Sequence, residues 1–357
     1  MRFLHIINVR WYNASAWYAV NLCRLLKESN HEVLVAGITS SPPIIKSKHY
    51  GIDTVEASFS SKNLFKIFKT IYKIEKILKT FKPDVINCHR GEYFWYFAVR
   101  RFFLPSNKWK LIRFRGDIRD PKNDILNRFL HKRCADLIIV TGKFIKDKFV
   151  NNLKIPDKKI DVLYGGVDTG EFYFDKDGRN RVRKEFEYSE DHFVVGIVGR
   201  FDPIKGHDDL IKALSNLYHK LNRRYARLLI IGYNSVITSE NIRKLVKAEN
   251  IESICTIVGH RKDIRACISA FDLAVISSIG SEAISRTAFE IMASGIPLVA
   301  SDTGVLPEIV VSGNIFHKRD IQELSDKIIN HSKNVCTYSD EAFLEQYSKY
   351  VEKLLKL

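Results

Sequence analysis

The sequence predicts an α/β fold made of two doubly wound, Rossmann-like domains. The chain has 357 residues, which is enough for two domains of ordinary size, and 45% of them are hydrophobic. Short apolar runs rich in β-branched residues alternate with longer amphipathic segments along its whole length. That alternation is typical of parallel sheets that carry helices on both faces.

The strands are expected in two series, separated by a region that breaks the periodicity. Glycines and the polar run Asp175-Lys176-Asp177-Gly178 interrupt the pattern over residues 165–178. We therefore expect a basic N-terminal domain at 1–168 and a second domain at 169–339, followed by a helix at 340–357. Strands are expected at 3–9, 32–38, 84–88, 110–114, 137–140, 159–163, 193–198, 227–231, 255–258, 273–277 and 297–300, with a helix at 16–29.

Positive charge is concentrated in the first half. The chain holds 57 Lys+Arg against 41 Asp+Glu, and the stretch 1–150 contains 28 basic and 12 acidic residues, whereas the remainder is balanced. This segregation predicts an anionic partner for the first domain: nucleic acid, a phosphorylated substrate or an acidic membrane surface. No zinc module, RNP-like strand or helix-turn-helix accompanies the charge, so a nucleic-acid-binding protein is the less favoured interpretation and we expect no nucleic acid.

The segment from Lys62 to Lys82 combines a lysine stripe with an apolar stripe at helical spacing. Such a helix can lie on an anionic leaflet, or it can pack on the sheet with its lysines in solvent, and the pattern favours neither. An aromatic run at 93–97, followed by Arg100 and Arg101, adds weight to the membrane interpretation, although core packing is its commoner explanation.

Compartment and metal use are inferred from features that the sequence lacks. It contains no uninterrupted apolar run of 18 residues and no secretory leader pattern, so we expect a cytoplasmic protein, peripheral at most to the inner face of the membrane. The D-x-D at 175–177 is expected to form a solvated turn, and no metal is expected. Six scattered cysteines are expected as buried thiols in a reducing cytosol: 23, 88, 134, 255, 267 and 336.

Two acidic residues in the second half stand where a ligand would bind. Glu282 precedes an expected helix that begins at Ser285, and Glu290 lies inside it. A helix N-terminus suits a phosphate, and Glu290 can accept hydrogen bonds from sugar hydroxyls nearby. Arg200 and Lys205 come after an apolar strand, at the end where α/β sheets bind ligands. By themselves these spacings also fit ordinary surface charges.

Several linked motifs now give the chain a family resemblance. They are G-R-x4-K-G at 199–206, E-x7-E at 282–290, and A-x-G-x-P followed by G-x-x-P-E at 293–308. Together they resemble the retaining nucleotide-sugar glycosyltransferases of the GT-B fold, group 1 or family 4. The segment 165–172 is similar to the interdomain segment of that family, and 84–89 is similar to one of its strands.

The resemblance implies two domains facing across a cleft, with the C-terminal helix packed back on the first. It implies transfer of a sugar from a nucleoside diphosphate to a hydroxyl of a glycan or lipid-linked acceptor, with retention, no cofactor and no metal. Arg200 and Lys205 would hold the diphosphate, Glu282 would face the sugar and Glu290 the ribose. The remaining donor-binding residues would be Gly259, His260, Arg286, Thr287, Gly304 and Val305.

The first domain departs from the family pattern. The turn at 11–16 lacks the glycine pair of the family, and Arg115 stands where a family histidine is expected. Candidate acceptor-side residues are therefore Asn13, His89, Arg115 and Asp117. We expect a role in bacterial cell-surface polysaccharide or lipopolysaccharide synthesis. A nucleotide-sugar epimerase or hydrolase of the same fold is the alternative.

Overall fold

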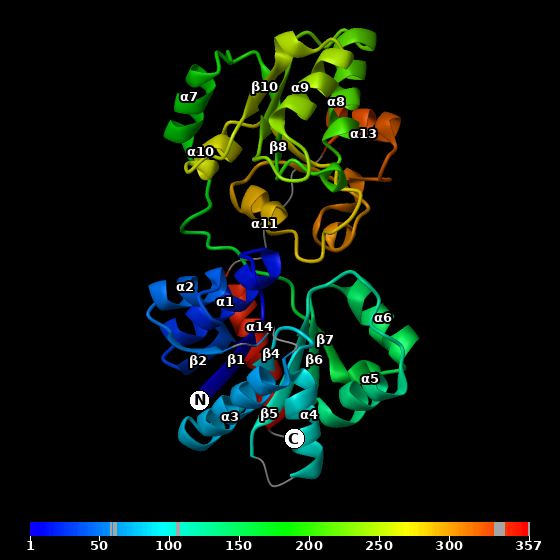
Figure 1. The fold of residues 1–357 in the computed structure, drawn as a ribbon. Coiled ribbons are helices and arrows are strands. Elements are labelled where there is room, and N and C mark those ends of the chain that lie inside the picture. Colours follow the sequence, from blue (N-terminus) through cyan, green and yellow to red (C-terminus); the bar gives the residue numbers. More distant parts are fainter. Residues whose placement is uncertain (58, 60–62, 105–107, 332–339, 356–357) are drawn as a thin grey trace. The chain divides into compact units, whose positions relative to one another are not determined.

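A computed structural model describes residues 1–57, 59, 63–104, 108–331 and 340–355. The chain forms two compact units (Figure 1): unit 1 comprises Met1–Gly165 and Glu341–Leu357, and unit 2 comprises Gly166–Asp340. Each unit has its own parallel sheet and its own helices, which confirms the expected α/β class with two doubly wound sheets.

Unit 1 is built on a seven-stranded sheet in which every strand pair is parallel, in the order β3-β2-β1-β4-β5-β6-β7. Such a sheet is buried on both faces, and its central strands are accordingly buried along their length. Its elements are β1 Arg2–Ile7, α1 Ala14–Glu28, β2 Glu32–Ile38, α2 Pro42–His49, β3 Asp53–Ala57, α3 Leu64–Thr80, β4 Val85–Cys88, α4 Phe94–Phe103, β5 Lys110–Arg115, α5 Ile125–Phe129, β6 Leu137–Val140, α6 Lys143–Leu153, β7 Ile160–Val162 and α14 Asp340–Leu355.

Unit 2 is built on a six-stranded parallel sheet in the order β10-β9-β8-β11-β12-β13. A continuous apolar core fills the space between one face of this sheet and the helices that cover that face. Its elements are α7 Lys176–Glu185, β8 Phe193–Val198, α8 His207–Ser215, β9 Ala226–Ile231, α9 Ser239–Ala248, β10 Cys255–Val258, α10 Ile264–Ser269, β11 Leu273–Ile276, α11 Arg286–Ala293, β12 Leu298–Ser301, α12 Leu306–Ile309, β13 Ile315–Phe316 and α13 Ile321–Ile329.

Each sheet has one topological switch point. In unit 1 the strand order reverses between β1 and β4, and in unit 2 it reverses between β8 and β11. The loops that leave the carboxyl ends of the two strands at such a point diverge, because their helices lie on opposite faces of the sheet. Ligands of open α/β sheets bind where those loops separate, so each switch point locates a candidate site.

The sequence analysis missed two strands and misread one segment. Strands β3 and β13 are short edge strands, and the half-buried, mixed-polarity sequence of β3 lacks the apolar run that marks the central strands. The polar run at 175–178 does not form a solvated turn: it begins α7, because the Asp175 side chain accepts a hydrogen bond from the Gly178 amide and caps the helix.

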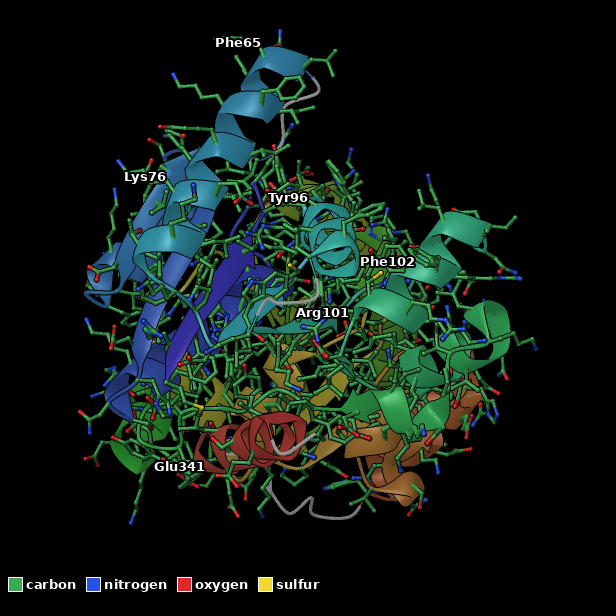
Figure 2. The ribbon with its side chains drawn as sticks, turned by 90° about the horizontal axis from the view of Figure 1, so that it is seen from below. Phe65, Lys76, Tyr96, Arg101, Phe102 and Glu341 are labelled. Carbon is green, nitrogen blue, oxygen red and sulfur yellow. The ribbon has the colours of Figure 1, made fainter. Side chains whose placement is uncertain are left out.

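The C-terminal helix α14 packs on the unit 1 sheet, on the face opposite to α3 and α4 (Figure 2). Its Tyr347 is fully buried against Phe3 and Phe114. Of the cysteines, Cys255 is only half-buried and Cys336 lies outside the described residues. The other four are buried free thiols: Cys23, Cys88, Cys134 and Cys267.

Candidate active site

The switch point of unit 2 brings Lys205 and Glu282 together. Lys205 ends a short turn after β8, Glu282 lies in the loop after β11, and the Lys205 Nζ is 2.5 Å from the Glu282 Oε1. Ser278 donates a second hydrogen bond, of 2.7 Å, to the same carboxylate oxygen. The Glu282 side chain is almost completely buried, whereas about a quarter of the Lys205 side chain is exposed (24%). The ammonium group therefore lies at the surface of the site, above a buried carboxylate that fixes its position.

Two glycines allow the loops at this site to approach one another. Gly206 has φ +66°, and a Cβ there would lie 1.9 Å from the Ser277 carbonyl oxygen. Gly304 has φ +60°, and a Cβ there would lie 2.0 Å from the Glu282 carbonyl oxygen. Since no side chain fits at either position, both glycines of the predicted motifs are required by backbone packing. They join the loops after β8, β11 and β12 into one rigid edge.

Arg200 lies two residues after β8 and is held by Asp202. The Asp202 Oδ2 accepts hydrogen bonds from the guanidinium at 2.9 and 3.0 Å, and its Oδ1 accepts from the Ile204 amide. The Arg200 side chain keeps 40% of its surface exposed. Asp202 thus orients a cation at the edge of the sheet. Sequence analysis did not single out Asp202, although an acid two residues after a strand-end arginine is a usable signal.

Helix α11 starts at Arg286, close to the expected Ser285, and places Glu290 in its second turn. The Arg286 Nε lies 2.5 Å from the Glu290 Oε1. Burial raises the pKa of the Glu290 carboxyl, and the Arg286 charge opposes that shift. Thr287 stands next to Arg286 in the first turn of the helix. Glu290 is therefore a buried carboxyl group paired with Arg286, and its proposed contact with a sugar hydroxyl stays a prediction.

One residue predicted to contact the donor has another partner in this structure. The Val305 amide, expected to offer its N–H to the donor, donates instead to the Glu282 carbonyl oxygen at 2.8 Å. The close approach that Gly304 permits creates this bond, so the Val305 N–H stabilises the loop after β11. The role of the Gly304 amide stays a prediction.

The outer part of the unit 2 edge carries aromatic side chains. Gly259 and His260 are exposed directly after β10. The His260 ring packs against Tyr233, which lies just after β9, with 6.3 Å between ring centroids. The sequence analysis did not select Tyr233. Like Arg200, however, Tyr233 follows an apolar strand by two residues, at the edge where ligands of such sheets bind.

Unit 1 places its four candidate residues at the carboxyl edge of its sheet. Asn13 caps α1, and its Oδ1 accepts from the Ala16 amide at 3.0 Å. Arg115 ends β5 and donates to the Arg119 carbonyl oxygen. Asp117 is paired with Arg119: burial raises the pKa of the Asp117 carboxyl, but hydrogen bonds from the Arg119 side chain and amide outweigh it and lower that pKa to about 2. Each of these three side chains thus has a structural partner.

His89 comes directly after β4 at the switch point of unit 1 and is buried. Its ring is nearly parallel to those of His5 and Phe114, with interplanar angles of 19° and 16° and centroid separations of 5.2 and 4.6 Å. The His89 Nε2 lies 2.9 Å from the His5 Nδ1. Burial, aided by the neighbouring His5 and Arg113, lowers the pKa of His89 well below its ordinary value, so the ring is neutral at physiological pH.

Within residues 1–57, 59, 63–104, 108–331 and 340–355, no cluster of three or more His, Cys, Asp or Glu is arranged to hold a metal ion. Over the same ranges, no helix combines the length and the hydrophobicity that crossing a bilayer requires.

Comparison with known proteins identifies the family. Residues 15–171 match the model of Glycosyltransferase Family 4, and residues 192–334 match the model of Glycosyl transferases group 1. Together the two matches cover most of the chain. The protein therefore belongs to the group 1 glycosyltransferases, and it has their GT-B architecture.

Individual relatives are distant. D-inositol 3-phosphate glycosyltransferase of Corynebacterium kroppenstedtii is 28% identical over 185 residues, a match that covers 50% of this chain and 41% of the relative. Anabaena Alr3699/HepE in complex with UDP has a TM-score of 0.85 at 17% identity over 99% of this chain and 100% of that protein. The lipopolysaccharide outer core galactosyltransferase WaaB, in its apo form, has a TM-score of 0.75 at 17% identity and full coverage of both chains. The chain spans between 41% and 65% of the length of four curated relatives that it matches.

Proposed function

We propose that the protein is a retaining glycosyltransferase that moves a sugar from a nucleoside diphosphate to a hydroxyl of a glycan or lipid-linked acceptor. The observation that carries this proposal is the pair of cations at the unit 2 switch point. Arg200 and Lys205 are both held by carboxylates and both partly exposed to the edge where ligands of such sheets bind. Two oriented cations at that place suit a pyrophosphate group.

The proposed chemistry uses these charges in the transition state. As the bond between the sugar and the β-phosphate oxygen breaks, positive charge develops on the sugar ring and negative charge on the departing phosphate. Arg200 and Lys205 stabilise the phosphate, and the buried Glu282 carboxylate holds Lys205 in place and faces the sugar. The leaving phosphate accepts the proton of the attacking hydroxyl on the same face, so the configuration is retained. No cofactor and no metal enters this mechanism.

The relatives support a nucleotide-sugar donor and suggest a pathway. Anabaena Alr3699/HepE, which shares the fold, forms complexes with UDP and with UDP-glucose. WaaB, another protein of this fold, is a lipopolysaccharide outer core galactosyltransferase. We propose a role in bacterial cell-surface polysaccharide or lipopolysaccharide synthesis for the present chain.

A thermal-shift screen of UDP-, GDP- and ADP-sugars tests the proposal. At least one is expected to raise the melting temperature of the wild type and to lose that effect in Lys205→Ala. Release of nucleotide is then measured with and without glycan or lipid-linked acceptors. Release that depends on an acceptor supports a transferase, whereas equal release without any acceptor indicates the hydrolase or epimerase alternative. The absence of a shift with every nucleotide sugar would contradict the proposal.

Unit 1 is proposed to bind the acceptor at an anionic membrane surface, through helix α3. The predicted single apolar stripe is divided in the structure: the face with Ile74, Ile77 and Leu78 is buried, but Phe68 faces solvent. The exposed apolar residues of α3 recur at helical spacing and form one outer face, which we name the α3 apolar face: Leu64, Phe65, Phe68 and Tyr72.

The α3 apolar face is flanked by positive charge. Lys66, Lys69 and Lys76 are exposed beside it, and Lys62 lies outside the described residues. The single acid of the helix, Glu75, is paired with Arg100 of α4. In Figure 2 the end of α3 that carries Phe65 projects from the rest of unit 1. Exposed aromatic side chains beside exposed lysines suit an anionic leaflet, because the rings enter the headgroup layer while the ammonium groups meet its phosphates.

Flotation with phosphatidylcholine vesicles, with and without phosphatidylglycerol, tests this surface. The wild type is expected to float with the anionic vesicles only. Phe65→Ser/Phe68→Ser is expected to lower binding strongly, since full burial of each ring contributes about 2 kcal/mol. The matched control is Ile125→Ser/Leu126→Ser, which removes two exposed apolar side chains of α5. Equal recovery on neutral and anionic vesicles, or equal losses in both variants, would contradict the proposal.

A further inference from the structure

A chain of buried hydrogen bonds joins the C-terminal helix to the switch point of unit 1. The Tyr347 hydroxyl lies 3.0 Å from the Asn87 Oδ1, and the Asn87 Nδ2 lies 3.0 Å from the His5 Nε2. The His5 Nδ1 lies 2.9 Å from the His89 Nε2. Tyr347, Asn87 and His5 are completely buried, whereas His89 keeps 8% of its surface exposed at the end of β4. The Tyr347–Asn87–His5–His89 chain therefore starts in the core and ends at the sheet edge.

The chemistry of its members fixes the direction of every proton. Asn87 is the one hydrogen-bond partner of the Tyr347 hydroxyl among the described residues, so the O–H must donate to the amide oxygen. The Asn87 amide nitrogen then faces His5 and donates to its Nε2. A neutral His5 consequently carries its proton on Nδ1 and donates it to the His89 Nε2.

We propose that this chain holds His89 as the Nδ1–H tautomer, so that it donates an uncharged hydrogen bond to an oxygen of a ligand at the unit 1 switch point. With its Nε2 occupied as an acceptor, His89 has only Nδ1 left for its proton. The hydrogen bond to His5 and the nearly parallel Phe114 ring fix the plane of the ring. The identity of the ligand as a sugar or acceptor oxygen rests on the proposed function, but the tautomer does not.

The residues around His89 suit this role. Arg113 is buried beside it, and its guanidinium donates to the Cys88 carbonyl oxygen. Burial lowers the pKa of both His5 and His89, and the nearby Arg113 charge adds to the effect at His89, so both oppose a second proton on that imidazole. His5, Asn87 and Tyr347 are thus positioning residues that act through His89, and the C-terminal helix contributes to the site without reaching it.

Nitrogen NMR of the full-length protein with ¹⁵N-labelled histidine tests the tautomer directly. The wild type is expected to show a protonated Nδ1 and an unprotonated Nε2 for both His5 and His89. Asn87→Leu and Tyr347→Phe each break the Tyr347–Asn87–His5–His89 hydrogen-bond chain, so a second tautomer of His89 is expected to appear. Tyr18→Phe is the matched control, because it removes another buried tyrosine hydroxyl of unit 1, bonded to Leu163.

Activity completes the test, with the nucleotide sugar that gives the largest thermal shift as the probe. Tyr347→Phe is expected to lower kcat/KM by about tenfold, the loss expected for one weakened hydrogen bond, while Tyr18→Phe stays near wild type. A wild-type His89 protonated on Nε2 or on both nitrogens would overturn the proposal, as would a changed tautomer with unchanged kcat/KM. The absence of any donor effect would instead contradict the proposed function and leave the tautomer result standing.

Discussion

The two units share the same parallel-sheet design but differ in the charged groups at their switch points. At its switch point unit 2 pairs each cation with a carboxylate, Arg200 with Asp202 and Lys205 with Glu282. Unit 1 instead places the neutral His5 and His89 at its switch point, beside a buried Arg113 whose guanidinium donates to the Cys88 carbonyl oxygen. The comparison teaches that one parallel-sheet design can place carboxylate-paired cations at the switch point of one unit and neutral histidines at that of the other.

The largest expected effect concerns the charged pair of unit 2. Lys205→Ala should lower kcat/KM by about 10²- to 10³-fold, the effect of removing one electrostatic stabiliser of developing charge. Glu282 would then be a buried carboxylate without its cation, so the free energies of unfolding of Lys205→Ala and of the double variant Lys205→Ala/Glu282→Gln are compared to measure that stability cost apart from catalysis. Lys244→Ala, an exposed lysine of α9, is the control. Steady-state kinetics check the prediction, and near-normal turnover would refute the role.

Acid should destabilise unit 1 more than unit 2. Among the described residues, unit 1 has three buried histidines, His5, His89 and His131, whereas unit 2 has His207. Burial lowers the pKa of His5 to about 3 and that of His131 and His207 to about 4. The unfolded chain, with histidine pKa near 6.5, therefore binds protons that the folded chain does not. The contribution of these histidines to the free energy of unfolding is fully present above about pH 6.5. It is lost as the pH falls toward 4, by up to about 1.4 kcal/mol per pH unit for each group.

Intrinsic fluorescence makes this difference measurable. All four tryptophans, at 11, 17, 95 and 109, belong to unit 1, whereas far-UV circular dichroism reports both units. Unfolding is followed in urea at pH 7 and at pH 5. Between the two pH values, the urea midpoint of the fluorescence transition, which reports unit 1, should change more than the midpoint of the remaining dichroism transition, which reports unit 2. His131→Phe removes one group that takes up a proton on unfolding. The pH-dependent change in the free energy of unfolding should therefore decrease by the share of about one proton. Equal shifts of both signals would show that the buried histidines do not distinguish the units.

The smallest expected effect concerns Asn13, which caps α1 and is also a candidate ligand contact. Asn13→Ala should lower the free energy of unfolding of unit 1 by about 1 kcal/mol, whereas Asn13→Ser keeps a capping oxygen and should change it little. Urea unfolding monitored by fluorescence measures both. If turnover falls equally in the two variants, Asn13 acts on a ligand as well as on the helix.

The sequence predicted the strands that are buried and apolar, and it missed those whose burial depends on neighbours. β8 and β11 are recognisable from their continuous apolar runs, whereas β3 acquires its strand conformation by pairing with β2. Asp175 shows a similar limit, because an acid shortly before a glycine can cap a helix or form a turn, and the choice depends on the residues beyond that glycine.

The candidate site was predictable where motifs fix the backbone. Gly206 and Gly304 occupy positions where no side chain fits, and the linked motifs pointed to Lys205 and Glu282 through the family resemblance. Partnerships across the fold were not predictable. Neither the bond from the Val305 amide to Glu282 nor that from Tyr347 to Asn87 has a sequence signature, since each joins residues far apart in the chain.

The central proposal is that unit 2 binds the pyrophosphate of a nucleotide sugar between the Arg200 guanidinium and the Lys205 ammonium group. A crystal structure of the protein soaked with the nucleotide sugar that the screen selects tests it most directly. The account predicts phosphate oxygens within hydrogen-bonding distance of the Arg200 guanidinium and the Lys205 Nζ. A nucleotide bound elsewhere, with both side chains still turned only toward Asp202 and Glu282, would contradict it.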